Sequence, residues 1–159
     1  MKNLLILFAV PMLLFCNFLP AQNSDSTGMG LVKSNPQIVY LFFKVEKTES
    51  GSEKIILQEK KITDGKLKSV PAYDESLLKT GDFVVSLTDI NGKSLVKQVV
   101  EDPLNPVMEV YENGISRNKV TLQAAEFSVR YPASEAIRIV SIEKVTVDGP
   151  QLLFTQRLY

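Results

Sequence analysis

The sequence predicts an all-β protein, an antiparallel β-sandwich of the immunoglobulin-like or jelly-roll-like kind with about eight strands. One reason is the stretch Gln37–Lys47, QIVYLFFKVEK, which is rich in the β-branched and aromatic residues that strands favour. The other is a series of turn signals that divides the chain into short segments, as in an all-β sandwich. These signals are Ser50-Gly51, Asp64-Gly65, Asn91-Gly92, Asn113-Gly114 and Asp148-Gly149. Asn-Gly and Asp-Gly suit tight antiparallel hairpins, so strand-helix-strand units are not expected.

The strands are expected to follow one another as hairpins around one core. Gln37–Lys47 is apolar on both faces, which is typical of a central strand. The turn signals delimit further strands over residues 53–63, 66–70, 82–90 and 93–101. Pro103 and Pro106 cannot donate ladder hydrogen bonds, which predicts a crossing between sheets. The apolar alternation changes phase at Ala124-Ala125, which predicts a bulge or a break between two strands.

At most one short helix is expected, over residues 74–79. Asp74 can cap its amino end, and Gly81 can end it. Leu77 and Leu78 can then face the core. A helix of this length makes only one or two turns, so strands remain the dominant element.

The first 21 residues predict a cleavable signal peptide. Lys2 precedes an apolar block over residues 4–15, and the small residue Ala21 marks the expected cut. The apolar block is shorter than the roughly 20 residues of a membrane-spanning helix. Bulky Phe15 before Cys16 disfavours lipid attachment. We expect a signal peptide (1–21), a flexible leader (22–36) and one β-sandwich domain (37–159), exported to the periplasm or secreted, with no integral membrane segment after cleavage.

The composition excludes several kinds of chemistry. The chain has no histidine, and its one cysteine, Cys16, leaves with the predicted signal peptide. Internal disulfides, zinc sites built on cysteine or histidine, and histidine-activated nucleophiles are therefore excluded from the mature domain. The 18 basic and 18 acidic residues balance, so nothing indicates the basic face of a nucleic-acid binder. We expect no cofactor.

Ser-x-x-Lys pairs occur three times, at Ser76/Lys79, Ser94/Lys97 and Ser141/Lys144. On a helix, a lysine one turn away can activate the serine. Only Ser76/Lys79 falls in the predicted helix. The other two pairs fall in predicted strands, where residues three apart face opposite sides and cannot act together. An exposed helical turn is the simpler interpretation of that pair.

Acidic residues offer a second candidate chemistry, since a glycoside hydrolase needs two carboxylates roughly 5 to 10 Å apart. Most acids of this chain lie at turns or alternate with lysines on strand surfaces. Glu109, Glu112 and Glu126 are the best-placed candidates. We nevertheless assign no catalytic residue from the sequence.

The stretch Asp89-Ile90-Asn91-Gly92 resembles the start of a calcium loop, because Asp and Asn oxygens two residues apart can wrap a hard cation. The distal glutamate of such a loop is missing. A hairpin tip already explains these residues, so we assign no metal-binding residue.

Lysines and aromatic residues have structural interpretations. Lys60, Lys61, Lys66 and Lys68 flank the Asp64-Gly65 turn. Lysines on an outer strand discourage edge-to-edge aggregation, which we favour over a basic binding ribbon. The strand aromatics are expected to pack in the core. They are Tyr40, Phe42, Phe43, Phe83, Phe127 and Phe154.

A family resemblance is carried by GDFVVSLTDINGK (residues 81–93), by Glu109-Val110-Tyr111 and by FSVRYP (residues 127–132). These stretches resemble small secreted β-sandwich proteins of unknown function. They are also similar to the accessory β-sandwich domain that precedes the catalytic domain in some IgA-peptidase-type secreted metallopeptidases. The resemblance spans roughly residues 37–147 and consists of strand-turn-strand patterns. The chain lacks the histidines of a zinc peptidase, so no functional residue is carried over.

Together these features predict an exported, non-enzymatic module that binds a protein or cell-envelope partner, by strand addition at an exposed sheet edge. The alternatives are a small hydrolase with a carboxylate-only site and an outer-membrane β-barrel. Against the barrel, Arg157 shares a face with Tyr159 where lipid would require apolar residues. Glu59 and Lys61 are expected to share a face with Ile55 and Leu57, which suits a strand that leaves a core for water.

Overall fold

The structure is a computed structural model that describes residues 35–70, 72–111 and 116–159. The predicted signal peptide and most of the predicted leader, together with Asn113-Gly114, lie outside the described residues. Within these ranges no helix is both long enough and apolar enough to cross a membrane.

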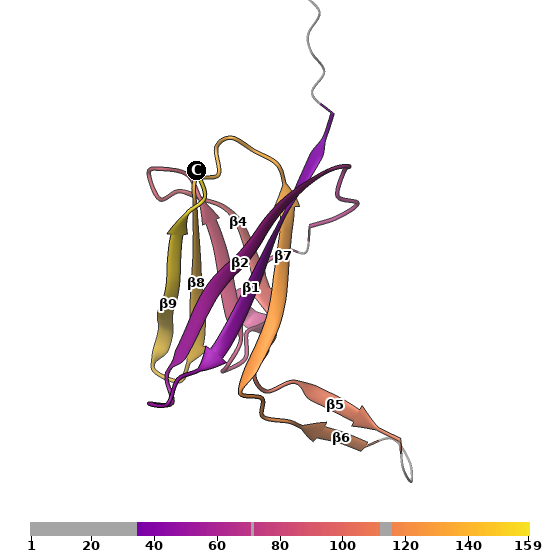
Figure 1. Ribbon diagram of the computed structural model, residues 1–159, viewed down its shortest axis with the longest axis vertical. Coiled ribbons are helices and arrows are strands. Elements are labelled where there is room, and N and C mark those ends of the chain that lie inside the picture. Colours follow the sequence, from indigo (N-terminus) through magenta and orange to yellow (C-terminus); the bar gives the residue numbers. More distant parts are fainter. Residues whose placement is uncertain (1–34, 71, 112–115) are drawn as a thin grey trace, which may run out of the picture. The chain divides into compact units, whose positions relative to one another are not determined.

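The described residues form nine strands in three antiparallel sheets (Figure 1). Sheet A has the order β2-β1-β7, with β1 Gln37–Lys47, β2 Glu53–Asp64 and β7 Ala124–Pro132. Sheet B has the order β4-β3-β8-β9, with β3 Phe83–Thr88, β4 Ser94–Val100, β8 Ile139–Thr146 and β9 Gly149–Arg157. Sheet C is the hairpin of β5 Val107–Val110 and β6 Ser116–Lys119. The predicted all-β sandwich is confirmed.

The core lies between sheets A and B, and alternate residues of β1 form one side of it. Val39, Leu41, Phe43 and Val45 are fully buried, as a central strand requires. The facing side comes from β3 and β8 of sheet B, and the residues that it contributes to the core cluster are Phe83, Val85, Leu87, Val140 and Ile142.

The aromatic residues divide between this core and an outer face. Phe43 lies 5.2 Å from Phe127 and 5.7 Å from Phe154 between ring centroids, which confirms core packing for these rings. Phe83 joins the same cluster through Phe127. The prediction is wrong for Tyr40 and Phe42, which alternate with the buried residues of β1 and stack on each other on the outer face of sheet A. Both faces of β1 are apolar, so apolarity alone did not show which face is inside.

A β-bulge in β2 decides which of its residues face the core. The register pairs Phe43 with Leu57 but Phe42 with Glu59, so Gln58 is an extra residue. Ile55 and Leu57 therefore face inward, whereas Glu59 and Lys61 face outward opposite Phe42 and Tyr40. The expectation that these four residues share a face is wrong, because the extra residue shifts the alternation by one. The same shift turns Lys60 to the inner side, opposite Leu41.

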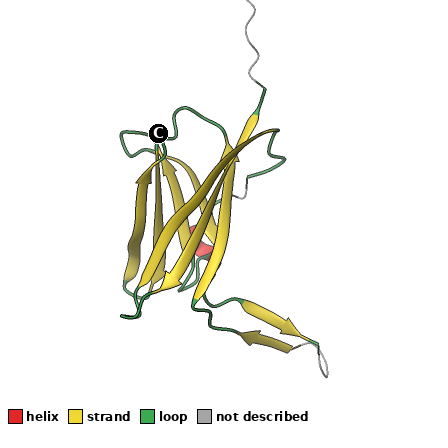
Figure 2. Cartoon of the chain, in the orientation of Figure 1, coloured by secondary structure: helices red, strands yellow, loops and turns green. Residues whose placement is uncertain are grey.

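The connections agree with the sequence in part. Gly51, Gly92 and Gly149 have φ values of +81°, +83° and +116° at hairpin turns, as predicted. Residues 66–70 form no strand, because the chain leaves β2 in a long connection to sheet B (Figure 2). The segment with Pro103 and Pro106 does join different sheets, from β4 of sheet B to β5 of sheet C. The predicted break between two strands is present, but it spans residues 120–123, because β6 ends at Lys119 and β7 begins at Ala124 and continues through Ala125 without a bulge.

The predicted helix is a single 3-10 turn, Glu75–Leu77 (Figure 2). Asp74 caps it as expected, since its Oδ1 accepts a hydrogen bond from Ser76 N at 2.9 Å. Leu77 is exposed, so the expectation that it faces the core is wrong. One turn is too short to turn a whole face toward the core. The turn also ends at Leu78, in extended conformation, and not at Gly81.

Gly81 does not end the helix, but its backbone conformation and the close approach of Asp102 both require a glycine. Its φ is +104°, and an added Cβ would lie 2.5 Å from Asp102 Oδ2. Asp102 is held in place because Oδ1 accepts from the amides of Leu104 and Asn105, and Oδ2 from Asn105 Nδ2. Gly81→Ala is expected to lower the free energy of unfolding by about 3 kcal/mol in urea titrations.

Gly51→Ala is the matched control for this substitution. Gly51 also has positive φ, at +81°, but an added Cβ would meet nothing within 4 Å. It should cost about 1 kcal/mol through backbone strain alone. Equal losses in the two variants would show that the approach of Asp102 to Gly81 is unimportant.

Candidate functional site

The acids that the sequence favoured are not brought together. Glu109 on β5 pairs with Arg117 at 3.0 Å and accepts a hydrogen bond from Tyr111 Oη at 2.8 Å. Glu126 on β7 accepts one from Gln58 Nε2 at 3.2 Å. The two acids belong to different sheets and share no partner among the described residues. Glu112, the third candidate, lies outside them.

The Ser-x-x-Lys pairs have structural roles. Ser76 Oγ donates to Asp74 Oδ1 at 2.7 Å as part of the helix cap. Lys79 extends toward Glu101, with Nζ 4.0 Å from Oε1. The other two pairs lie on β4 and β8, as expected.

The candidate calcium loop is a hairpin turn. Asp89 Oδ1 accepts from the amides of Asn91 and Lys93, each at 2.9 Å, and so closes the β3–β4 connection. Across the part of the chain that the structure describes, no group of three or more Cys, Asp or Glu side chains is placed to hold a metal ion.

The lysines of β2 lie on an edge strand of sheet A, as predicted. Lys60 and Lys61 point to opposite faces of that strand. Lys66 and Lys68 follow in the connection after β2. The four lysines therefore do not form one basic ribbon across paired strands.

The β5–β6 hairpin presents apolar side chains to solvent. Val107 is 63% exposed, Met108 49% and Tyr111 70%. Its two strands pair only with each other among the described strands. Figure 1 shows the hairpin leaving the sandwich near the start of β7.

The base of this hairpin is firmly attached to the sandwich. Leu104, just before β5, is fully buried in the core cluster. Leu122 N donates to Leu104 O at 2.8 Å, and Val120 N donates to Pro106 O at 3.1 Å. Thr121 Oγ1 also donates to Asn105 Oδ1 at 2.9 Å. The buried Leu104 therefore anchors the base of the hairpin in the core, and the three hydrogen bonds join its two arms to each other. Among the described strands, β5 and β6 pair only with each other.

The exposed apolar side chains occupy both faces of the hairpin. Val107 pairs with Lys119 and Glu109 with Arg117, so one face carries Val107 beside three charged residues. Met108 pairs with Asn118 on the other face. The sequence carries a turn signal, Asn113-Gly114, between these two strands. It does not mark Val107 or Met108 as exposed, because the same strand sequence can be covered or left uncovered by other strands.

Comparison of the chain with protein-family models, characterised proteins and solved structures found no match. No finding links it to the accessory domain of IgA-peptidase-type metallopeptidases, and that resemblance stays a prediction.

Proposed function

We propose that the protein is an exported, non-enzymatic binding module whose β5–β6 hairpin docks a protein partner of the cell envelope or its surroundings. The observation that carries the proposal is a two-stranded hairpin with exposed apolar side chains on both faces. A hairpin of two strands is marginal alone in water, and a third strand or a covering surface stabilises it. A partner would supply that strand.

The alternation of the apolar residues favours an added strand over a flat partner surface. A flat surface laid on one face would cover Val107 or Met108, but not both. An extended segment running along the edge of β5 lies beside both faces, because its own side chains alternate in the same way. The Glu109–Arg117 pair neutralises charge at the centre of the hairpin. We therefore expect a partner segment with alternating apolar residues.

The edges of the larger sheets are less available for strand addition. The edge strand β2 of sheet A lies against β9 of sheet B. The other edge of sheet A, β7, lies near β4. Each of these edges therefore has a neighbouring strand from the facing sheet, whereas among the described strands β5 and β6 pair only with each other.

Photo-crosslinking in the cells that produce the protein tests this function. A photo-reactive residue at Met108 is expected to give an adduct with another protein, which mass spectrometry identifies. The same residue at Val147, an exposed position in the β8–β9 turn, should not give that adduct. In the purified complex, hydrogen exchange of the β5 amides should slow about tenfold or more, since a new ladder would protect them.

A pair of substitutions separates the hairpin from general apolar surface. Val107→Asp should weaken partner affinity at least about tenfold, because a carboxylate would be buried in the new interface. Leu152→Asp, at an exposed residue of β9, should leave affinity unchanged. Equal effects from both variants, no adduct at Met108, or an adduct only with another copy of this chain would each contradict the proposal.

A further inference from the structure

A cavity of about 630 Å³ lies at the end of the sandwich where β9 finishes and the β7–β8 connection passes. Its lining includes Pro36, Ile62, Ala133, Glu135, Arg138 and Tyr159. Small-molecule sites in proteins commonly have volumes of about 300 to 1,000 Å³. The cavity is therefore large enough for a small ligand, and it involves no residue of the β5–β6 hairpin.

One wall of the cavity is core-facing apolar surface that no described residue covers. Ile62 pairs with Val39, so both side chains point to the inner side of sheet A. Val39 is fully buried, yet Ile62 is 47% exposed. The ring of Tyr159 and the side chains of Pro36 and Ala133 add further apolar surface. Filling this space with an apolar group would remove that surface from water.

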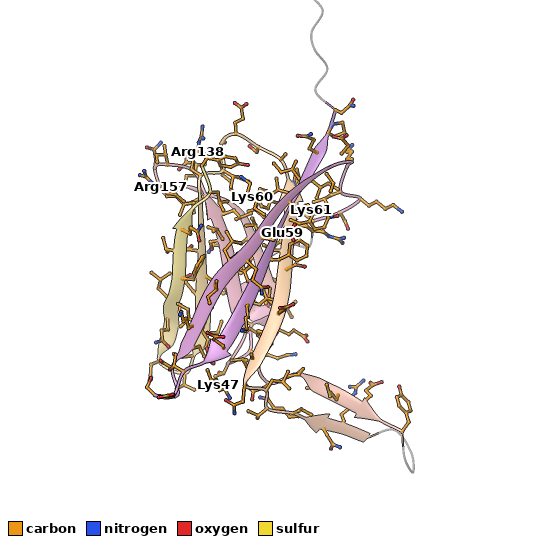
Figure 3. All side chains as sticks on the ribbon, viewed as in Figure 1. Lys47, Glu59, Lys60, Lys61, Arg138 and Arg157 are labelled. Atoms are coloured by element: carbon orange, nitrogen blue, oxygen red, sulfur yellow. The ribbon has the colours of Figure 1, made fainter. Side chains whose placement is uncertain are left out.

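The Tyr159 ring in this lining is approached by two cations. Lys60 Nζ lies 3.2 Å from the ring centroid and donates to Leu158 O at 3.3 Å. Arg138 Cζ lies 5.8 Å from the same centroid. Figure 3 shows Lys60 and Arg138 at the same end of the sandwich. Among the described residues, no carboxylate pairs with Lys60 or Arg138 within 4.0 Å.

This charge arrangement favours an anion over a third cation. The π-face of an aromatic ring attracts cations, but Lys60 and Arg138 already approach the Tyr159 ring. Arg138 is the cation of the described lining and Glu135 its acidic side chain, and no ion pair within 4.0 Å joins the two. Lys60 is not part of the lining, but it adds a second positive charge at the Tyr159 ring. A carboxylate ligand could accept two parallel hydrogen bonds from the Arg138 guanidinium.

The Tyr131 hydroxyl is a buried polar group on the same rung of sheet A as Ile62, but Tyr131 is not part of the cavity lining. It is buried and has no hydrogen-bond partner among the described residues. Tyr131 and Ile62 both pair with Val39, so they share one rung of sheet A. Burial raises the pKa of the Tyr131 hydroxyl, and the charge of nearby Tyr159 raises it further. The group is therefore a neutral donor, and leaving it unpaired is costly.

We propose that this cavity binds a small amphipathic carboxylate of the fatty-acid class. The Arg138 guanidinium holds the carboxylate, and the alkyl chain lies against Ile62 and the Tyr159 ring. Lys60 acts as a positioning residue, because it holds the ring and the adjacent Leu158 carbonyl.

Calorimetric titration of the purified protein with octanoate tests the site. Octanoate should bind at least about tenfold more tightly than acetate, which lacks the chain, and than 1-octanol, which lacks the charge. Amide resonances of Ile62 and Arg138 should shift on titration. No binding, or equal binding of octanoate and 1-octanol, would overturn the proposal and would leave the hairpin proposal unaffected.

Three variants assign the contacts. Arg138→Gln should weaken octanoate binding by about tenfold, whereas Arg157→Gln removes a charge at the same end of the sandwich without touching the cavity and should change it less than about twofold. Tyr131→Phe should change binding less than about twofold, because Tyr131 does not line the cavity, and Tm should stay equal or rise, because no hydrogen bond within the protein is lost. Equal affinity in the wild type and Arg138→Gln would contradict the assigned carboxylate contact.

Discussion

Replacing Phe43 with alanine is expected to lower the free energy of unfolding by about 4 kcal/mol, measured by urea denaturation. Phe43 is fully buried at the centre of β1, and its ring contacts those of Phe127 and Phe154. These two rings come from β7 of sheet A and β9 of sheet B. The substitution would leave a cavity at the place where the two sheets meet, and the surrounding strands cannot collapse to fill it.

Phe42→Ala is the control because it removes the same side chain from the neighbouring position. Phe42 is only partly buried, and its ring stacks on Tyr40 on the outer face of sheet A. Its loss should cost about 1 kcal/mol, since less apolar surface returns to water and no closed cavity forms. A loss at Phe42 as large as that at Phe43 would contradict the assignment of inner and outer faces in β1.

Replacing Glu53 with alanine is expected to cost about 3 kcal/mol of unfolding free energy. Glu53 on β2 pairs with Lys144 on β8, so this ion pair joins the two sheets. The side chains of Glu53 and Lys144 are 10% and 21% exposed, so the ammonium group of Lys144 would keep little water after its partner is removed. Removing one partner of a buried ion pair typically costs about 3 to 5 kcal/mol. We expect the low end of that range because both side chains are still partly exposed.

Two further variants show whether burial causes this effect. Glu46→Ala breaks the Lys44–Glu46 pair on the outer face of sheet A, where these side chains are 38% and 33% exposed, and should cost far less than Glu53→Ala because water solvates both charges. The double variant Glu53→Leu with Lys144→Met should recover most of the loss, because neither charge remains buried. A double variant as unstable as Glu53→Ala would show that the ion pair itself, and not the unpaired charge, stabilises the fold.

The sequence alone determined the features that depend on local chemistry. The turn signals correctly placed hairpin turns at Gly51, Gly92 and Gly149, because few residues other than glycine adopt positive φ without strain. The β-branched and aromatic run of β1 predicted a central strand, and the phase change at Ala124 predicted the start of β7. The absence of histidine likewise excluded catalysis by histidine-activated nucleophiles, because composition alone decides whether an imidazole base is present.

Tertiary structure decided which of two equivalent faces is inside and which side chains meet. The bulge at Gln58 turned Lys60 inward toward Tyr159, and no pattern in β2 marked this shift, because a bulge depends on pairing with β1. Ile62, Arg138 and Tyr159 come together at one cavity only when three distant segments fold. The exposure of Val107 and Met108 likewise depends on which strands lie beside β5. Local sequence specifies the conformation of each strand, whereas its neighbours are set by long-range packing that alternation does not encode.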